Sequence, residues 1–325
     1  MSRIDWKPLL LALVVLLGAL LLVQNPSTWL TLTIAGLAMG LLIFLMASGL
    51  TLVFGLMDVM NFAHGLFITT GAYVAASVMR RLAGPAEAES LLANLGAVVP
   101  AVLAAMAVAG LLGFFFERVI VRPVYGQHLK QILITTGGMI VAEQLILALW
   151  GPEQMALERP RALRGAFIVG EMALEKYRLA AVVVGLAVFA AMLVLLNRTR
   201  IGLLIRAGVE NREMVEAMGY RIRRLFVAVF VAGSALAGLG GALWGMYERN
   251  FTVQVGAHMM VLIFIVIIIG GLGSVGGCFA ASLLVGLVAN YVGYLSPKIA
   301  LGSNILLMVL VLLWRPQGLY PVGRQ

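Results

Sequence analysis

Apolar residues run along most of this chain in long stretches, separated by short segments that hold charged residues, proline or glycine. Ten stretches are candidates for membrane-spanning helices, and they cover residues 9–23, 29–56, 59–79, 91–116, 131–150, 179–196, 225–247, 259–270, 277–295 and 299–314. A span needs about 20 apolar residues, so the short 259–270 stretch and the 59–79 stretch, which has a polar insert, are candidates for re-entrant or broken helices. The pattern predicts an all-α, polytopic transmembrane helical bundle of about 8–10 spans.

The composition agrees with a membrane protein. The 325 residues are 62% hydrophobic and 11% charged, whereas soluble domains are about 45–50% apolar and about 25% charged. This balance excludes cytosolic enzymes, secreted disulfide scaffolds and nucleic-acid binders. The net charge of +9 does not point to nucleic acid, because the basic residues lie in short segments between apolar stretches. The preference for positive residues on the inner side of a membrane accounts for them.

That preference also orients the chain. With the N-terminus inside, the inside segments hold 14 of the 23 basic residues, so we expect both termini in the cytoplasm. The first 23 residues resemble a signal peptide, but Gln24-Asn25-Pro26-Ser27 offers no cleavage site between small residues, and we expect residues 1–28 to form an uncleaved extra N-terminal span. The two longest loops, 151–178 outside and 197–224 inside, are too short for a soluble domain. Residues 1–325 are therefore expected to form a single transmembrane domain.

Polar residues interrupt the third apolar stretch within Met57–Gly65. Asn61 and His64 are three residues apart, so on a helix they share one face. Two interpretations are open: these side chains hydrogen-bond the backbone of a broken helix, or they line a translocation path or gate. The pair Asn61-Phe62 recurs as Asn250-Phe251 after another Gly-rich apolar stretch. Two matched residues are too few to predict an internal repeat.

A Gly-rich segment, Gly270–Gly277, joins the eighth and ninth apolar stretches. Within it, Gly271-Leu272-Gly273-Ser274-Val275-Gly276 fits the dinucleotide-binding fingerprint, but that site also needs an acidic residue about 20 positions later. No Asp or Glu follows Glu248, which excludes a dinucleotide site. The segment is either a structural turn or a mobile element that lines a substrate path.

One acidic residue, Glu143, lies inside a predicted span. Because a carboxyl group is costly at membrane depth, we expect it to point inward, toward a hydrogen-bond donor on another helix; a proton relay is the alternative. His64, His128 and His258 show no metal-ligand spacing, and the phosphate-binding G-x-x-x-x-G-K-[ST] motif is absent. We therefore expect no catalytic residue, no metal site and no bound nucleotide in this chain.

The inside loop 197–224 contains a short amphipathic segment. Between Glu210 and Met218 the residues Met214, Ala217 and Met218 form one apolar edge of a helix, and Gly219 follows as a stop signal. The helix lies on lipid headgroups or docks in a groove of a cytoplasmic partner. Its three acidic residues are unfavourable against anionic lipid, so we favour docking.

Several of these motifs together resemble one family. The chain looks like the LivH-type permease of branched-chain amino acid ABC importers in Asn61-Phe62-Ala63-His64-Gly65, preceded by Gly49-Leu50-Thr51 and Gly55-Leu56, in Arg206…Asn211-Arg212-Glu213-Met214…Met218-Gly219, in Gly233–Gly238, in Gly270–Gly277, in Arg122-Pro123 and in Arg315-Pro316-Gln317-Gly318. The similarity extends from about residue 30 to residue 318. The extra N-terminal span and Asp58 depart from the pattern.

The resemblance implies a multi-pass subunit of the bacterial inner (cytoplasmic) membrane, with no enzymatic activity of its own. Its partners would be a LivM-type second permease, two cytoplasmic ABC ATPases that bind ATP and Mg²⁺, and a periplasmic substrate-binding protein. Residues 197–224 would be the coupling loop, with ATPase-coupling residues Arg206, Glu210, Arg212, Glu213, Met218 and Gly219. The expected substrate-pathway residues are Asn61, Phe62, His64, Gly65, Gly271, Gly273 and Ser274.

By this resemblance the chain moves branched-chain or similar small hydrophobic amino acids by alternating access. Urea, short amides or another small polar solute are alternative substrates for the same kind of permease. A self-sufficient secondary transporter would need no ATPase partner. A polytopic membrane transferase would need clustered Asp, His or Arg at one membrane face, whereas the charged residues here are spread along the chain.

Overall fold

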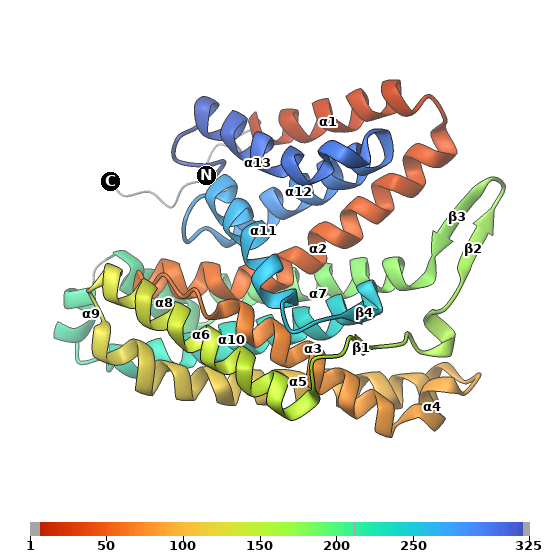
Figure 1. The fold of residues 1–325 in the computed structure, drawn as a ribbon. Coiled ribbons are helices and arrows are strands. Elements are labelled where there is room, and N and C mark those ends of the chain that lie inside the picture. Colours follow the sequence, from red (N-terminus) through yellow and green to blue (C-terminus); the bar gives the residue numbers. More distant parts are fainter. Residues whose placement is uncertain (1–6, 211, 321–325) are drawn as a thin grey trace.

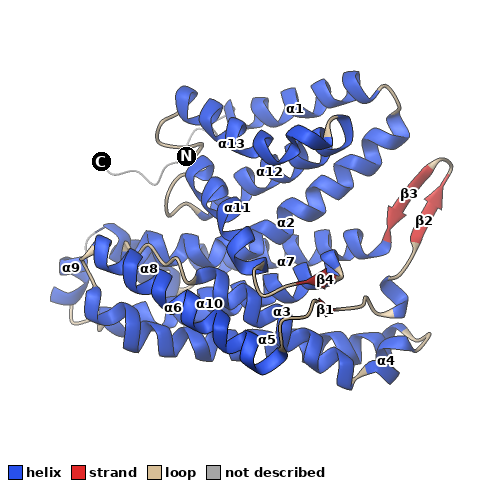
Figure 2. Cartoon of the chain, viewed as in Figure 1, coloured by secondary structure: helices blue, strands red, loops and turns tan. Residues whose placement is uncertain are grey.

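The computed structural model describes residues 7–210 and 212–320, most of which are helical (Figures 1 and 2). A helix occupies each of the ten predicted ranges. These helices are α1 (Lys7–Val23), α2 (Pro26–Met57), α3 (His64–Arg81), α5 (Leu91–Phe116), α6 (His128–Trp150), α7 (Lys176–Arg198), α10 (Ile222–Glu248), α11 (Val255–Gly270), α12 (Val275–Leu295) and α13 (Pro297–Trp314). The prediction of an all-α bundle is confirmed.

Among the described residues, six helices are long and apolar enough to cross a membrane: α2, α5 with the two short helices that continue it, α6, α7, α10 and α12. Apolar helices at 10–23, 255–270 and 302–314 are shorter, and α3 ends in Arg80 and Arg81. The chain is thus a multi-pass membrane protein in which some helices are too short or too polar to span by themselves.

Short elements connect these helices at the two ends of the bundle. One end carries α8 (Arg200–Glu210) and α9 (Arg212–Ala217), and we call it the α8–α9 end (Figure 1). The opposite, hairpin end carries α4 (Ala83–Glu87) and the antiparallel hairpin of β2 (Ala166–Val169) and β3 (Met172–Glu175). The remaining elements are the antiparallel pair β1 (Met155–Ala156) and β4 (Asn250–Phe251), the π-helix η1 (Glu117–Val121), and the 3₁₀ helices η2 (Arg122–Val124) and η3 (Arg161–Leu163).

Glycine residues bring the core helices into backbone contact. A Cβ atom added to Gly49 of α2 would lie 2.3 Å from the carbonyl oxygen of Gly233 on α10. On the other side of α2, a Cβ at Gly40 would lie 2.6 Å from the carbonyl oxygen of Ser282 on α12. Small residues permit this close approach, which gives packing and dipolar contacts that lipid chains cannot supply.

Two helices begin inside the bundle instead of at its surface. The ring nitrogen Nε2 of His64, the first residue of α3, hydrogen-bonds the carbonyl oxygen of Met46 at 2.9 Å. Met46 precedes the last residue of α2, Met57, by eleven positions, or about 16 Å along the helix axis. Residues 58–63 therefore run back into the bundle before α3 starts. The 59–79 stretch, a candidate for a re-entrant or broken helix, begins with non-helical residues, and its helix starts at His64.

The first turn of α11 meets the first turn of α3 at this depth. A Cβ atom on Gly65 would lie 2.7 Å from the carbonyl oxygen of Gly256, whose N–H donates to Oγ1 of Thr69 at 3.1 Å. Each of the two non-helical segments that lead into these helices contains one of the matched pairs, Asn61-Phe62 or Asn250-Phe251. The two matched residues thus mark corresponding breaks, although the sequence by itself did not justify a repeat.

A buried arginine joins the loop after α6 to two helices at the hairpin end. Arg159 is 7% exposed and donates to the carbonyl oxygens of Met246 (2.9 Å) and Tyr247 (3.1 Å), in the last turn of α10. Its Nη1 also donates to the Glu175 carboxylate at 2.9 Å, and its guanidinium stacks on the Tyr177 ring at 4.6 Å. These bonds satisfy carbonyl groups that the helix itself leaves unpaired.

We expect Arg159→Ala to lower the free energy of unfolding by roughly 2–4 kcal/mol, because two buried carbonyl groups and one carboxylate lose their donor. Glu175 keeps Arg178 at 3.4 Å, which limits the loss. Arg161→Ala is the matched control, since the Arg161–Glu89 pair is exposed on both sides and is worth about 0.5 kcal/mol. Thermal unfolding in detergent measures both variants. Equal decreases in the unfolding temperature of the two variants would show that the bonds of Arg159 stabilise the fold no more than an exposed ion pair does.

Candidate functional site

The segment that carries the predicted signature, residues 58–65, leads from the α8–α9 end into the core. Asp58 ends α2 in a left-handed conformation (φ 53°), and its carboxylate lies 3.8 Å from Nε2 of His128, the first residue of α6. Asn61 is fully buried; its Oδ1 accepts the N–H of Ala63 at 3.1 Å. Its Nδ2 has no hydrogen-bond partner among the described residues. Asn61 precedes α3, so it does not share a helical face with His64 as the spacing predicted.

His64 and Gly65 are buried where α3 meets its neighbours. The His64 ring bonds the α2 backbone and packs edge-on against Phe67, and Gly65 faces the backbone of α11. Phe62 is only partly buried: its N–H donates to Oγ1 of Thr135 on α6 at 3.3 Å, and its ring lies 4.9 Å from that of Phe264. In this arrangement Asn61 Oδ1 and His64 Nε2 bond backbone groups, and the side chains of Met60 and Phe62 are more exposed than theirs.

The predicted glycine turn lies at the α8–α9 end. Gly271 and Gly273 have positive φ angles of 98° and 80°, which glycine adopts without strain. Ser274 caps α12 by accepting the N–H of Gly277 at 3.1 Å. A Cβ on Gly55, near the end of α2, would lie 3.0 Å from the Cα of Gly273. The structure therefore does not gather the predicted pathway residues in one place: Asn61, His64 and Gly65 lie deep, and Gly271, Gly273 and Ser274 lie at one end.

The predicted coupling segment forms a second, exposed region. The structure places two helices there, α8 and α9, where the sequence predicted one, and Asn211 between them lies outside the described residues. α9 ends as predicted: Gly219 has a φ of 85°, and the N–H groups of Gly219 and Tyr220 donate to the carbonyl oxygens of Glu216 and Val215. This is the bonding pattern of a Schellman C-cap.

The apolar edge of α9 points away from the bundle. Met214 and Met218 are 61% and 68% exposed, and Glu213 is exposed next to them. Val215, next to Met214 in the sequence, is buried and holds α9 against the chain. The two flexible methionine side chains, with acidic neighbours, form a small surface of the kind that a groove in another protein binds.

α8 connects α9 with the last turn of α2. Ile205 is buried, and a Cβ on Gly208 would lie 2.9 Å from Cδ1 of Leu56. Leu56 is two residues before Asp58, where residues 58–63 begin. Arg206, also predicted for coupling, is exposed, and its Nη1 lies 3.4 Å from Oδ1 of Asn197. Glu210 ends α8 and Arg212 begins α9.

Glu143 lies on α6 as predicted, but without the expected donor. Its Oε1 atom is buried and has no hydrogen-bond partner within the described part of the chain. Most of α6 is not covered by other helices: 11% of its apolar span is buried inside the chain, against 83% for α2. The interior pair that the sequence suggested is therefore not formed by this chain's described residues.

Sequence reasoning missed several residues around these sites. Gln131 and Thr135 of α6 are fully buried, Thr135 bonds the signature segment, and Gly256 contacts the backbone of Gly65 at the start of α3. Two polar residues at i and i+4 in an apolar stretch, as Gln131 and Thr135 are, are the sequence signal that could have identified this pair. Nothing local in the sequence identifies Gly256 as the partner of Gly65, because the contact joins residues far apart in the chain.

Comparisons with known proteins agree on one family. The sequence model described as "Branched-chain amino acid transport system / permease component" matches residues 32–314. The high-affinity branched-chain amino acid transport system permease protein BraD of Pseudomonas aeruginosa is 29% identical over 299 residues, covering 87% of this chain and 93% of BraD. The corresponding protein LivH of Escherichia coli is 30% identical, covering 87% and 92%, and LivM of Escherichia coli is 26% identical, covering 99% and 77%. No solved structure gives a significant match.

Proposed function

The chain belongs to the family of permease components of branched-chain amino acid transport systems, and from this premise we propose that it is one of two permeases in an ATP-driven importer of the inner membrane. The second permease would be of the LivM type. Two cytoplasmic ABC ATPases would supply energy, and a periplasmic protein would deliver the substrate. Relatives from two bacteria carry branched-chain amino acids in their names, so leucine, isoleucine and valine are the proposed substrates.

The observation that carries this proposal is the outward-facing apolar edge of α9. Ala217 and Met218 are exposed on a capped helix and give it an apolar surface of the kind that a protein partner covers. Glu213 and Glu216 beside it make a membrane surface an unfavourable partner. A groove on one of the two ATPases would bind this edge, and ATP with Mg²⁺ would act on the ATPases, not in this chain.

The contacts of α8 suggest how ATPase movement reaches the membrane part. α9 is joined to α8, α8 packs through Gly208 on Leu56 of α2, and residues 58–63 follow directly. Gly55 in the same turn of α2 touches Gly273 of the glycine turn. The end of α2 therefore contacts both segments that we predicted for the substrate pathway. A rigid-body shift of the glycine-packed core would follow movement of α9, and the path would open to one side and then the other.

Co-purification tests the proposal. The tagged chain, expressed from its own locus, is extracted in mild detergent and the co-purifying proteins are identified. We expect a second permease and proteins with the phosphate-binding motif of ATPases, and ATP-dependent uptake of L-leucine after reconstitution with the binding protein. Recovery of the chain alone, active in liposomes without ATP, would overturn the proposal in favour of a self-sufficient transporter.

A further inference from the structure

Helices α3 and α10 pack backbone to backbone in the core of the bundle. A Cβ on Gly71 of α3 would lie 2.3 Å from the carbonyl oxygen of Gly238 on α10, and one on Gly241 would lie 2.0 Å from that of Ile68. Asn61 and His64, beside this contact, are buried. Helices that touch backbone to backbone leave no room for an amino acid between them. A substrate path therefore follows an outer face of this chain, where a second subunit completes it.

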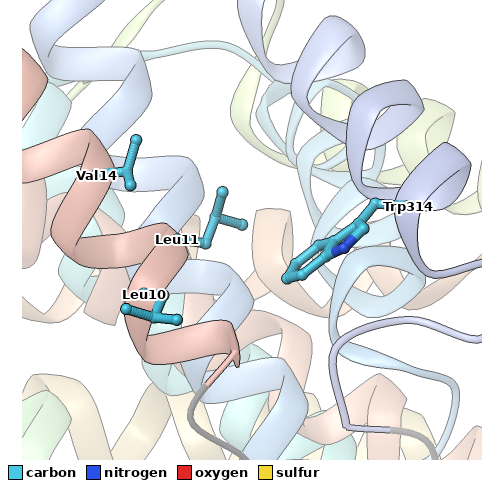
Figure 3. Close-up of a pocket in the computed structure, with 4 residues that line it drawn as sticks. All are labelled: Leu10, Leu11, Val14 and Trp314. Atoms are coloured by element: carbon cyan, nitrogen blue, oxygen red, sulfur yellow. The ribbon is translucent and has the colours of Figure 1, made fainter.

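An apolar groove between α1 and α13 does not meet this need. It has a volume of about 240 Å³ and is lined by Leu10, Leu11, Val14 and Trp314 (Figure 3). These side chains offer no partner for the ammonium or carboxylate group of an amino acid, and a zwitterion in such a groove would lose its hydration without compensation. The groove has the chemistry of a surface that lipid covers.

One side of α6 has a different chemistry. Thr136 and Gln144 are exposed, and Glu143 is partly buried with its Oε1 atom unpaired among the described residues. Thr136 and Glu143 are seven positions apart, which places them on the same face two turns from each other. The same flank also exposes the apolar side chains of Leu133 and Ile140, and the opposite flank exposes only apolar ones, Ile134, Val141 and Leu145 among them. Polar and ionisable groups at membrane depth are costly in lipid, so we expect protein or water next to Thr136, Glu143 and Gln144.

This polar flank begins next to the signature segment. Thr135, adjacent to Thr136, is fully buried and accepts the N–H of Phe62 at 3.3 Å. Phe62 is the member of the signature that is only partly buried, and Met60, two residues before it, is exposed. Through Thr135 and Phe62, α6 thus contacts residues 58–63. These residues follow the end of α2, on which α8 packs.

We propose that Thr136, Glu143 and Gln144 line a water-filled substrate path along α6, and that the Glu143 carboxylate binds the ammonium group of the amino acid as it passes. This inference rests on the proposed function, because the second permease forms the other wall. A cationic side chain of that permease would pair with Glu143 but would leave Thr136 and Gln144 without a partner. An aqueous path satisfies all three groups, and an ammonium ion is the one charged group of the substrate that a carboxylate attracts.

Cysteine accessibility tests whether the flank is wet. The chain has a single cysteine, Cys278, which is buried, so the wild type serves as the blank. We compare Thr136→Cys with Leu145→Cys in the purified complex, using the membrane-impermeant cation 2-(trimethylammonium)ethyl methanethiosulfonate. Thr136→Cys should react at least about tenfold faster than Leu145→Cys. L-leucine at about 10 mM, enough to saturate a weak site, should slow the reaction of Thr136→Cys. Equal, slow reaction of both variants in a complete complex overturns the inference.

Transport kinetics test the role of the carboxylate. Glu143→Gln should lower the rate of L-leucine uptake about tenfold, the effect of losing one charge-assisted hydrogen bond, with the second permease and basal ATP hydrolysis retained. Glu143→Asp keeps the charge and should restore most of the rate. Glu153→Gln, an exposed acid in the loop after α6, is the control and should leave uptake unchanged.

The outcomes separate the two proposals. If Glu143→Gln releases the second permease, Glu143 is a structural pair at the subunit interface and the inference is wrong. Uptake at the wild-type rate in Glu143→Gln also overturns it. A wild-type preparation that contains no second permease would overturn the proposed function, and this inference with it.

Discussion

Replacing Gly256 with alanine should destabilise the bundle more than any exposed substitution. The new Cβ atom would lie 1.9 Å from the carbonyl oxygen of Gly65 and 2.5 Å from Oγ1 of Thr69. The obstacle is mostly backbone, at the point where the first turns of α3 and α11 meet, so no side-chain rotation relieves the clash. Overpacking of a core costs about 1–3 kcal/mol, and we expect a loss of at least the upper value because two helices must separate.

Gly293→Ala in α12 is the matched control. Gly293 is also a helical glycine, but no atom lies within 4 Å of the position of its Cβ. Alanine there should leave stability unchanged or raise it by about 0.5–1 kcal/mol, through helix propensity. Thermal unfolding of both variants in the same detergent gives the comparison. If Gly256→Ala unfolds at the same temperature as Gly293→Ala, the first turns of α3 and α11 are not in close contact in the protein.

Replacing Glu213 with arginine should abolish uptake while the protein remains folded and inserted. Glu213 is exposed on α9 beside Met214, in the surface that we propose binds an ATPase. Reversing a charge at the edge of a buried apolar contact removes any favourable pairing and introduces repulsion. We expect ATP-dependent uptake of L-leucine to fall to background, with loss of ATPase subunits from the purified complex and recovery of the second permease.

Glu171→Arg provides the same change of charge at the opposite end of the molecule. Glu171 is exposed in the turn between β2 and β3, far along the chain from α9, and its substitution should leave the ATPase subunits bound. Normal uptake by the Glu213→Arg variant would remove α9 from the list of coupling elements. It would leave the membership of the family, which rests on sequence similarity, unaffected.

The positions of the ten apolar helices followed from the sequence, because a long apolar stretch bounded by polar residues has few alternatives to a helix in a membrane. The C-terminal end of α9 was also predictable, since Gly219 supplies the left-handed residue that ends it. α8 was missed: Gly202 and Gly208 weaken the helical signal of residues 200–210. Gly208 is there because α8 packs closely on Leu56, a contact that no local pattern reveals.

The sequence by itself thus determined the class of protein, the number and place of its apolar helices, and the short capped helix at the α8–α9 end. These are local properties, set by hydrophobicity and by the conformations that single residues allow. Only the tertiary structure decided that His64 and Asn61 are buried in the core, that Gly65 meets Gly256, and that Oε1 of Glu143 finds no hydrogen-bond partner among the described residues. Those outcomes depend on which helices approach one another, and contacts between distant residues leave no trace in the spacing along one chain.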